Sequence, residues 1–248
     1  LSECKCEAYA YGHQCCDFSD GTLVCLTPGE SISMKENNKE FPSKGWILAF
    51  HPDLICGTPL GLNIHNYTFF SYCPEEALHL SLREKQIILE FLERIRQELE
   101  RCIDRHSKKI ISKYIELLLD YCTRFYERQF ITRSEVNKKV FREFNHLLDN
   151  HFNVKVSLST DVLSDEYCAN LLHLSPAYFN DLLKYEIGKE FKEYIQFKRF
   201  EIAKGWLVNT DKTLGQIAQE LGFSNSQYFS RLFKKITGCS PNEFRMPN

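Results

Sequence analysis

The chain has 248 residues, of which 43% are hydrophobic and 26% charged, and its formal net charge is −2 at pH 7. This balance is typical of a folded globular protein and excludes a disordered or collagen-like chain, while the length favours two domains. No apolar run reaches the roughly 18 residues that a membrane helix needs, and no secretory signal opens the chain. The first residue is Leu1 rather than Met, which suggests that the N-terminus has been trimmed.

The eleven cysteines show no regular spacing. A chain of this size can bury a core without disulfides, so we expect reduced thiols in a cytoplasmic protein. Several cysteines and histidines near the N-terminus are nevertheless candidate metal ligands: Cys4, Cys6, Cys15, Cys16, His13, His51, His65 and His79. Their spacing matches no zinc motif, so we expect no metal and no cofactor.

Glycine and proline divide the chain, because neither occurs between Glu75 and Ser175. Before this stretch, short β-branched and aromatic runs at 21–26, 46–50 and 67–70 predict strands of a small sheet or part of a barrel. Glu75 and Glu76 are expected at a helix start, where carboxylates favour the helix dipole.

Helical spacing of apolar residues then predicts three helices, at about 82–103, 110–125 and 135–150. The apolar arc of the second helix is wider than one core-facing stripe requires. Two interpretations explain this wide arc equally well. The helix is buried between its partner helix and the sheet, or it forms a dimerisation surface.

The last 90 residues contain an internal repeat. Tyr178-Phe179, Leu182, Lys184 and Gly188 recur 50 residues later as Tyr228-Phe229, Leu232, Lys234 and Gly238. Each copy is predicted to be a helix, a tight turn at His173 or Gly222, and a second helix that begins after Ser175-Pro176 or Ser224-Asn225. Two such copies predict a pair of helix-turn-helix units, whose second helices enter the DNA major groove.

A linker helix is predicted between the two units, from Glu190 to Val208. Its length of roughly 28 Å, together with the width of the units, approaches the ~34 Å of one DNA turn. Gly205 weakens this helix, and a close packing contact is the expected reason for a glycine there.

The C-terminal motifs resemble those of the arabinose-operon regulator (AraC/XylS) type of transcription factor. The residues that carry the resemblance are Ile217-Ala218, Leu221 to Ser224, Tyr228 to Lys235, Gly238 to Pro241, Phe244-Arg245, Arg199, Ile202 and Ala203. The resemblance implies a mainly α fold with a partial cupin-like β effector region over residues 1–80, which we expect to be truncated. A helical dimerisation pair over 81–130 and a DNA-binding domain over 131–248 would follow.

The resemblance also indicates which side chains face the groove: Ala177, Asn180 and Asp181 in the first unit, and Ser226, Gln227, Ser230 and Arg231 in the second. Gln and Asn pair with adenine, and Arg pairs with guanine or holds a phosphate. Lys234 and Lys235 suit phosphates, but a solvated helix end explains them equally well. Asp181 stands where the family often has a basic residue, so we expect the first unit to contribute less affinity.

These features predict a sequence-specific transcription regulator that binds double-stranded DNA as a homodimer, responds to a small-molecule effector and acts indirectly on RNA polymerase. The alternative is a cupin-type metal enzyme or metal sensor with a DNA-binding appendage. No serine nucleophile elbow, phosphate loop or HExxH motif is present in the sequence, so we expect no catalytic residues.

Overall fold

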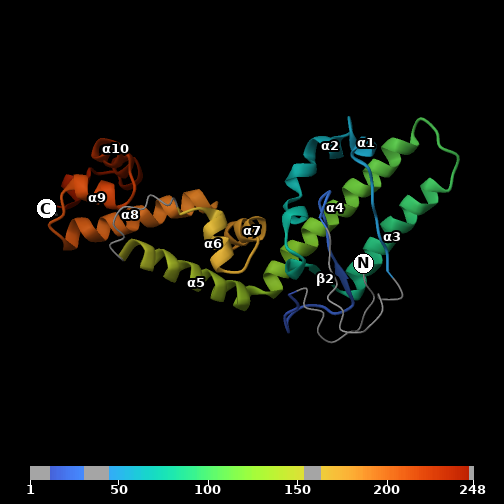
Figure 1. Ribbon diagram of the computed structural model, residues 1–248, viewed down its shortest axis with the longest axis horizontal. Coiled ribbons are helices and arrows are strands. Elements are labelled where there is room, and N and C mark those ends of the chain that lie inside the picture. Colours follow the sequence, from blue (N-terminus) through green and yellow to red (C-terminus); the bar gives the residue numbers. More distant parts are fainter. Residues whose placement is uncertain (1–11, 31–44, 154–162, 246–248) are drawn as a thin grey trace.

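The computed structural model describes residues 12–30, 45–153 and 163–245 of the chain. In Figure 1 the molecule is elongated, with an N-terminal lobe at one end and the last helices at the other. The long helix α5 (Ser134–Asn153) runs between the two ends. The predominance of helix confirms the predicted mainly α fold. No helix in the described segments has both the length and the apolar character needed to cross a bilayer.

The N-terminal lobe contains a sheet of two short antiparallel strands, β1 (Gly21–Leu23) and β2 (Leu78–Leu80). Gly21 pairs with Leu80 and Leu23 with Leu78. The chain between them forms short helical segments: α1 (Pro52–Ile55), α2 (Pro59–Asn63), and the 3-10 turns η1 (Ile64–Asn66), η2 (Thr68–Ser71) and η3 (Pro74–Glu76).

Two of the predicted strands are therefore wrong, and so is much of the predicted β character of this region. Residues 46–50 have no regular structure, and residues 68–70 lie in the 3-10 turn η2, which Tyr67 directly precedes. The apolar run at 67–70 is buried against a helix instead of a sheet, since the ring of Phe69 stacks on Tyr126 at 5.4 Å. The described part of residues 1–80 forms no barrel, and the remaining residues of that range lie outside the described segments.

Two long helices complete this lobe, α3 (Leu82–Leu99) and α4 (Ser107–Thr132). Ser81 caps α3 in a capping box with Glu84, which explains the start of the helix. The helix ends four residues before the predicted Ile103, whose side chain is 85% exposed in the loop that follows. Helix α4 packs against α3, β2, α1 and α2, so most of its wide apolar arc is buried within the chain.

We call the buried cluster of this lobe the N-terminal core. It joins the sheet, the short helices, α3 and α4, and it also includes Tyr178 and Leu182 from the C-terminal region. One hydrophobic core thus crosses from the N-terminal lobe into the first predicted helix-turn-helix unit.

The C-terminal region contains the remaining helices: α6 (Asp165–Leu171), α7 (Pro176–Ile187), α8 (Phe191–Asn209), α9 (Leu214–Glu220), α10 (Ser226–Thr237) and α11 (Pro241–Arg245). Helix α8 is the predicted linker helix. Its first half packs into a middle core with Phe144, Phe179 and Leu183, and its second half into a C-terminal core with Ile217, Phe229 and Phe233.

The expected close contact at Gly205 is absent. A Cβ placed on Gly205 would meet no heavy atom within 4 Å among the described residues. Packing therefore does not require a glycine at this position of α8.

Candidate nucleic-acid interface

Helices α6–α7 and α9–α10 form two hairpins with the same turn. The turn residue has a positive φ in both, 56° at His173 and 72° at Gly222. In each hairpin the next amide donates back to the buried alanine of the first helix: Leu174 N to the Ala169 carbonyl at 2.9 Å, and Phe223 N to the Ala218 carbonyl at 2.8 Å. This confirms the two predicted helix-turn-helix units.

The second helix of each hairpin has a side-chain cap at its start. Ser175 Oγ accepts from Tyr178 N at 3.2 Å, and Asn225 Oδ1 accepts from Tyr228 N at 2.7 Å. Each helix ends at a left-handed glycine, Gly188 or Gly238. These caps fix where α7 and α10 begin and end, and therefore which of their side chains point outward.

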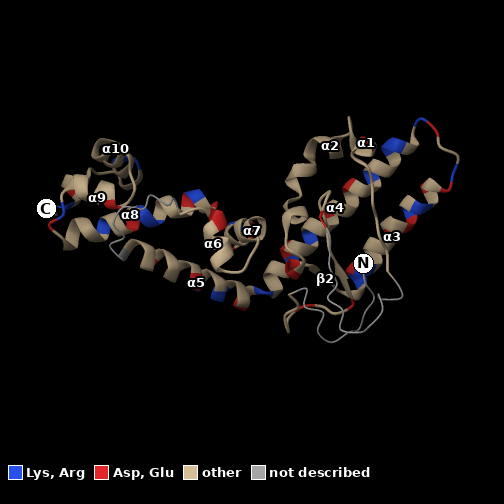
Figure 2. Ribbon diagram, viewed as in Figure 1, with Lys and Arg blue, Asp and Glu red and all other residues tan. Residues whose placement is uncertain are grey.

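Helix α10 presents an open polar face. Gln227, Arg231, Lys234 and Lys235 are exposed, while Ser226 and Ser230 are half-buried. Ser230 Oγ donates to the Ser226 carbonyl at 2.8 Å, which leaves its oxygen to accept rather than donate. Tyr228 is 41% exposed. Figure 2 shows basic and acidic residues intermixed in both halves of the molecule.

An arginine side chain packs against the turn of the second hairpin. The guanidinium of Arg199 on α8 lies 3.7 Å from the position a Cβ would take on Gly222, and it lies over the ring of Phe223. Burial lowers the pKa of Arg199. A side chain at position 222 would have to adopt the strained left-handed backbone next to this group, so glycine suits the turn.

Helix α7 is in a different environment, because the N-terminal lobe covers its polar face. Tyr72 donates through its hydroxyl to Asp181 Oδ2 at 2.8 Å. Asn180 Nδ2 donates to Asp165 Oδ2 at 2.9 Å, and Ala177 packs on the N-terminal core. The three side chains predicted to face the groove from α7 are thus half-buried, and each contacts another part of the chain, which sequence reasoning missed.

The start of α7 is also held by a carboxylate from the N-terminal lobe. Glu76 in η3 is 4% exposed, and its Oε1 accepts from the amide of Ser175 at 2.6 Å, while Oε2 accepts from the Ser175 hydroxyl. Burial raises the pKa of Glu76 against the opposing effect of these hydrogen bonds. As the sequence predicts, Glu76 lies at the start of a helical segment, the 3-10 turn η3, where it accepts a hydrogen bond from Cys73 N. The same carboxylate also faces the start of α7, through its bonds with Ser175.

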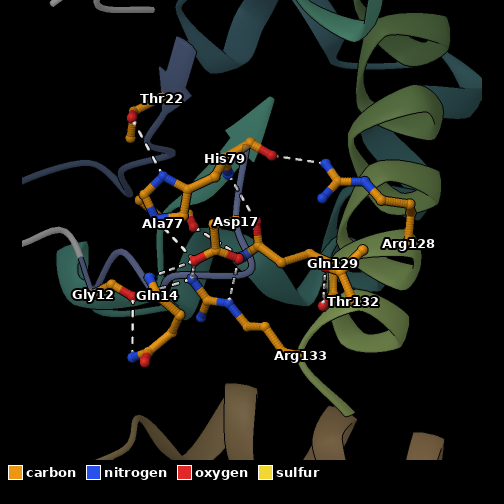
Figure 3. Close-up of polar contacts among 10 residues, drawn as sticks. All are labelled: Gly12, Gln14, Asp17, Thr22, Ala77, His79, Arg128, Gln129, Thr132 and Arg133. Carbon is orange, nitrogen blue, oxygen red and sulfur yellow. Dashed lines mark hydrogen bonds and ion pairs between the residues drawn. The ribbon is translucent and has the colours of Figure 1, made fainter. Parts of the chain in front are cut away.

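A buried ion pair lies beneath this contact. Arg133, at the end of α4, donates through Nε to Asp17 Oδ1 at 2.8 Å and through a terminal nitrogen to the carbonyl of Gly12 at 3.1 Å. Figure 3 shows Asp17 between Arg133 and His79. Burial raises the pKa of Tyr178 on α7, and the positive charge of the nearby Arg133 partly offsets this rise.

The candidate metal ligands do not gather into a site. Cys4 and Cys6 lie outside the described residues. Among the residues that the structure describes, no three His, Cys, Asp or Glu side chains are placed to hold a metal ion together. The rings of His13 and His79 are 4.9 Å apart, but His79 is buried beside Asp17.

Similarity to known proteins agrees with the geometry of the two hairpins. Residues 168–246 match a protein-family model described as a helix-turn-helix domain. The similarity of this region to the arabinose operon regulatory protein agrees with the AraC-type resemblance seen in the sequence.

Three relatives show how far the similarity extends. The uncharacterised HTH-type regulator YtdP of Bacillus subtilis is 33% identical over 111 residues, 45% of this chain and 14% of its own length. The arabinose operon regulatory protein of Salmonella typhimurium is 32% identical over 41% of this chain and 32% of its own. The uncharacterised regulator YijO of Escherichia coli is 24% identical over 91% of this chain and 76% of its own. The chain thus spans less than a third of the length of the first two relatives.

Proposed function

We propose that this protein is a sequence-specific transcription regulator that reads duplex DNA through α10, with Gln227 and Arg231 facing the bases. The observation that carries this proposal is the open polar face of α10, which is held by a capped start and a left-handed turn. Among the described residues, Arg231 and Lys235 have neither an ion pair nor a hydrogen-bond partner, so both are available to DNA. Arg pairs with guanine in two places, whereas Lys holds phosphates as a point charge.

The direct test is selection of duplexes from a randomised library with the full chain at low salt. Recovery of a common sequence motif is expected. Arg231→Ala should then lose about 1–3 kcal/mol of binding to the selected duplex and little binding to unrelated DNA. Arg101→Ala is the matched control, because Arg101 is also exposed but lies at the far end of α3. Failure to select any motif at any salt concentration contradicts the proposal.

We further propose that the chain acts as a homodimer, with residues 81–130 as the dimerisation pair, residues 1–80 as the effector region and residues 131–248 as the DNA-binding domain. Exposed apolar side chains on one stretch of α4, Ile110 and Leu117, support self-association there. They border a shallow hollow of about 660 Å³. Sedimentation of the full chain tests this point, since a monomer at micromolar concentration is incompatible with it.

Control by a small-molecule effector, transcription activation and an indirect action on RNA polymerase are proposed from the resemblance to AraC-type regulators. We expect such a regulator to act in the cytoplasm, where its DNA lies. A thermal-shift screen of small sugars and metabolites against the full chain tests the effector.

A further inference from the structure

The two recognition helices differ in how open they are. The side chains of α10 that are predicted to face DNA are largely in solvent, whereas those of α7 are half-buried, and α7 itself packs on η2 of the N-terminal lobe. Tyr178 and Leu182 on α7 are 4% and 1% exposed, because the N-terminal core encloses them. The contacts of Ala177 and Asp181 with the N-terminal lobe would therefore obstruct duplex DNA at these two positions of α7.

The contact at the start of α7 uses the same groups that bind a phosphate. The first amides of a helix and a capping hydroxyl are donors that commonly hold a DNA phosphate in helix-turn-helix complexes. Here the amide and hydroxyl of Ser175 both donate to the carboxylate of Glu76. The negatively charged carboxylate of Glu76 thus accepts the two hydrogen bonds from Ser175 that a DNA phosphate would otherwise accept.

A second contact lies nearly two turns further along α7. The Tyr72 hydroxyl donates to Asp181, and the Tyr72 ring meets the edge of Tyr178 at 5.1 Å. A carboxylate at position 181 is unfavourable beside phosphates, but it is well suited to accept a buried phenol hydroxyl. Burial and the charge of Asp181 raise the pKa of Tyr72, so the phenol remains protonated as the donor.

We propose that Tyr72 and Glu76 form an autoinhibitory cover that imitates DNA, so that the protein binds with α10 alone until α7 leaves the N-terminal lobe. This inference rests on the proposed DNA-binding function. Any signal that separates α7 from η2 and η3 would then lengthen the bound DNA segment by the part that α7 reads.

The test compares Tyr72→Phe with Tyr67→Phe in the full chain. Tyr67 is the matched control, because its hydroxyl also donates to a carboxylate, Asp120 Oδ1, at 2.8 Å, but that bond does not involve α7. A hydrogen bond to a charged group contributes enough for its loss to shift the docking equilibrium about tenfold or more. Amide hydrogen exchange in the first turn of α7 should therefore accelerate about tenfold in Tyr72→Phe and stay unchanged in Tyr67→Phe.

DNA binding supplies the second measurement. The probe is a duplex selected from a randomised library by the Tyr72→Phe protein itself. Because apparent affinity scales with the fraction of competent protein, the variant should bind it more tightly than wild type by the same factor as the exchange acceleration. Its hydroxyl-radical footprint should be longer by roughly one helical turn, about 10 base pairs. Glu76→Gln, which removes the imitating charge, should act in the same direction.

Each outcome is decisive. If α7 exchanges faster in Tyr72→Phe and Glu76→Gln while affinity and footprint stay as in wild type, the cover does not inhibit DNA binding. If exchange in α7 does not change, the two contacts do not hold the helix, and the inference is also wrong. If wild type and variants alike select no motif, the proposed DNA-binding function itself fails, which is distinguishable because in the first two cases α10 still selects DNA.

Discussion

One substitution in the buried ion pair of Asp17 and Arg133 should change the stability of the N-terminal lobe by a predictable amount. The side chains of Asp17 and Arg133 are 0% and 6% exposed, and two hydrogen bonds of 2.8 and 2.5 Å join them. Arg133→Met keeps much of the volume of the side chain and removes the charge. Asp17 would then remain buried with the imidazole of His79 at 3.9 Å but no guanidinium.

The expected loss follows from the cost of an unpaired buried charge. Removing one partner of a buried ion pair typically costs 3–5 kcal/mol, far more than the net contribution of the intact pair. We therefore expect Arg133→Met to lower the free energy of unfolding by about 3–5 kcal/mol at pH 7. The double variant Asp17→Asn/Arg133→Met should recover part of this loss, because it leaves no charge to bury.

The pH dependence of the free energy of unfolding should differ between wild type and Arg133→Met, because the pKa of Asp17 shifts in opposite directions in the two proteins. In wild type, burial favours the neutral form of Asp17, but the hydrogen bonds from Arg133 and from the amide of Gln14 outweigh it and hold the pKa below its usual value. The contribution of Asp17 is therefore present above the unfolded pKa of about 3.9 and is lost as the pH falls through the lower folded pKa. Without Arg133, burial dominates and the folded pKa lies above the unfolded one. The variant should then lose stability as the pH rises from about 4 toward 7, whereas the contribution of Asp17 in wild type stays nearly constant over this range.

Urea unfolding between pH 4 and pH 7 measures both quantities. Arg96→Met is the matched control, because Arg96 also bonds two carboxylates, Glu93 and Glu100, but in solvent, so its loss should leave the free energy of unfolding almost unchanged. The reasoning is refuted if Arg133→Met loses less than about 1 kcal/mol at pH 7, or if its stability follows the same pH trend as wild type.

Three further predictions concern the C-terminal region. Lys235→Ala should weaken binding to all duplexes alike and reduce the slope of log K against log salt by about 1, as measured by fluorescence anisotropy; a loss confined to one sequence contradicts a phosphate contact. Gly205→Ala should raise the free energy of unfolding by up to about 1 kcal/mol, because its Cβ meets no neighbour and alanine favours helix; destabilisation would reveal a hidden constraint. His173→Gly should stabilise the first hairpin by about 1 kcal/mol in thermal unfolding, since His173 occupies the left-handed region at φ 56°; unchanged or reduced stability argues against strain at this turn.

Local chemistry explains why the two hairpins are predictable from the sequence. The left-handed turn, the cap at Ser175 and the small Ala169 each constrain only a few neighbouring residues, and their repetition 49 to 50 residues later removes chance matches. The start and end of a capped helix are likewise set within one turn. These elements lie where the sequence predicts them.

The strands predicted at 46–50 and 67–70 fail for a physical reason. Aromatic and β-branched residues favour strands mainly because they suit a half-buried surface, and a helix can supply that surface as well. Tyr67 to Phe70 find it on α4, where Phe69 stacks on Tyr126. No local pattern distinguishes the two environments.

The cover over α7 could not be predicted from the sequence, because the residues that form it are far apart in the chain. Tyr72 and Asp181 are separated by 109 residues, so no periodicity connects them. The one available signal was the carboxylate at position 181, which fits poorly beside phosphates. It is explained by a contact within the protein.

Helix α7 has two apolar faces that belong to different parts of the molecule. Phe179 and Leu183 are held in the middle core, while Tyr178 and Leu182 are held in the N-terminal core. Separation of α7 from the N-terminal lobe transfers the second pair into water, which carries a positive heat-capacity change. Apolar association of this kind weakens on cooling, so the lobe holds α7 less firmly in the cold than at room temperature. Temperature alone would then change the share of molecules in which both recognition helices are free.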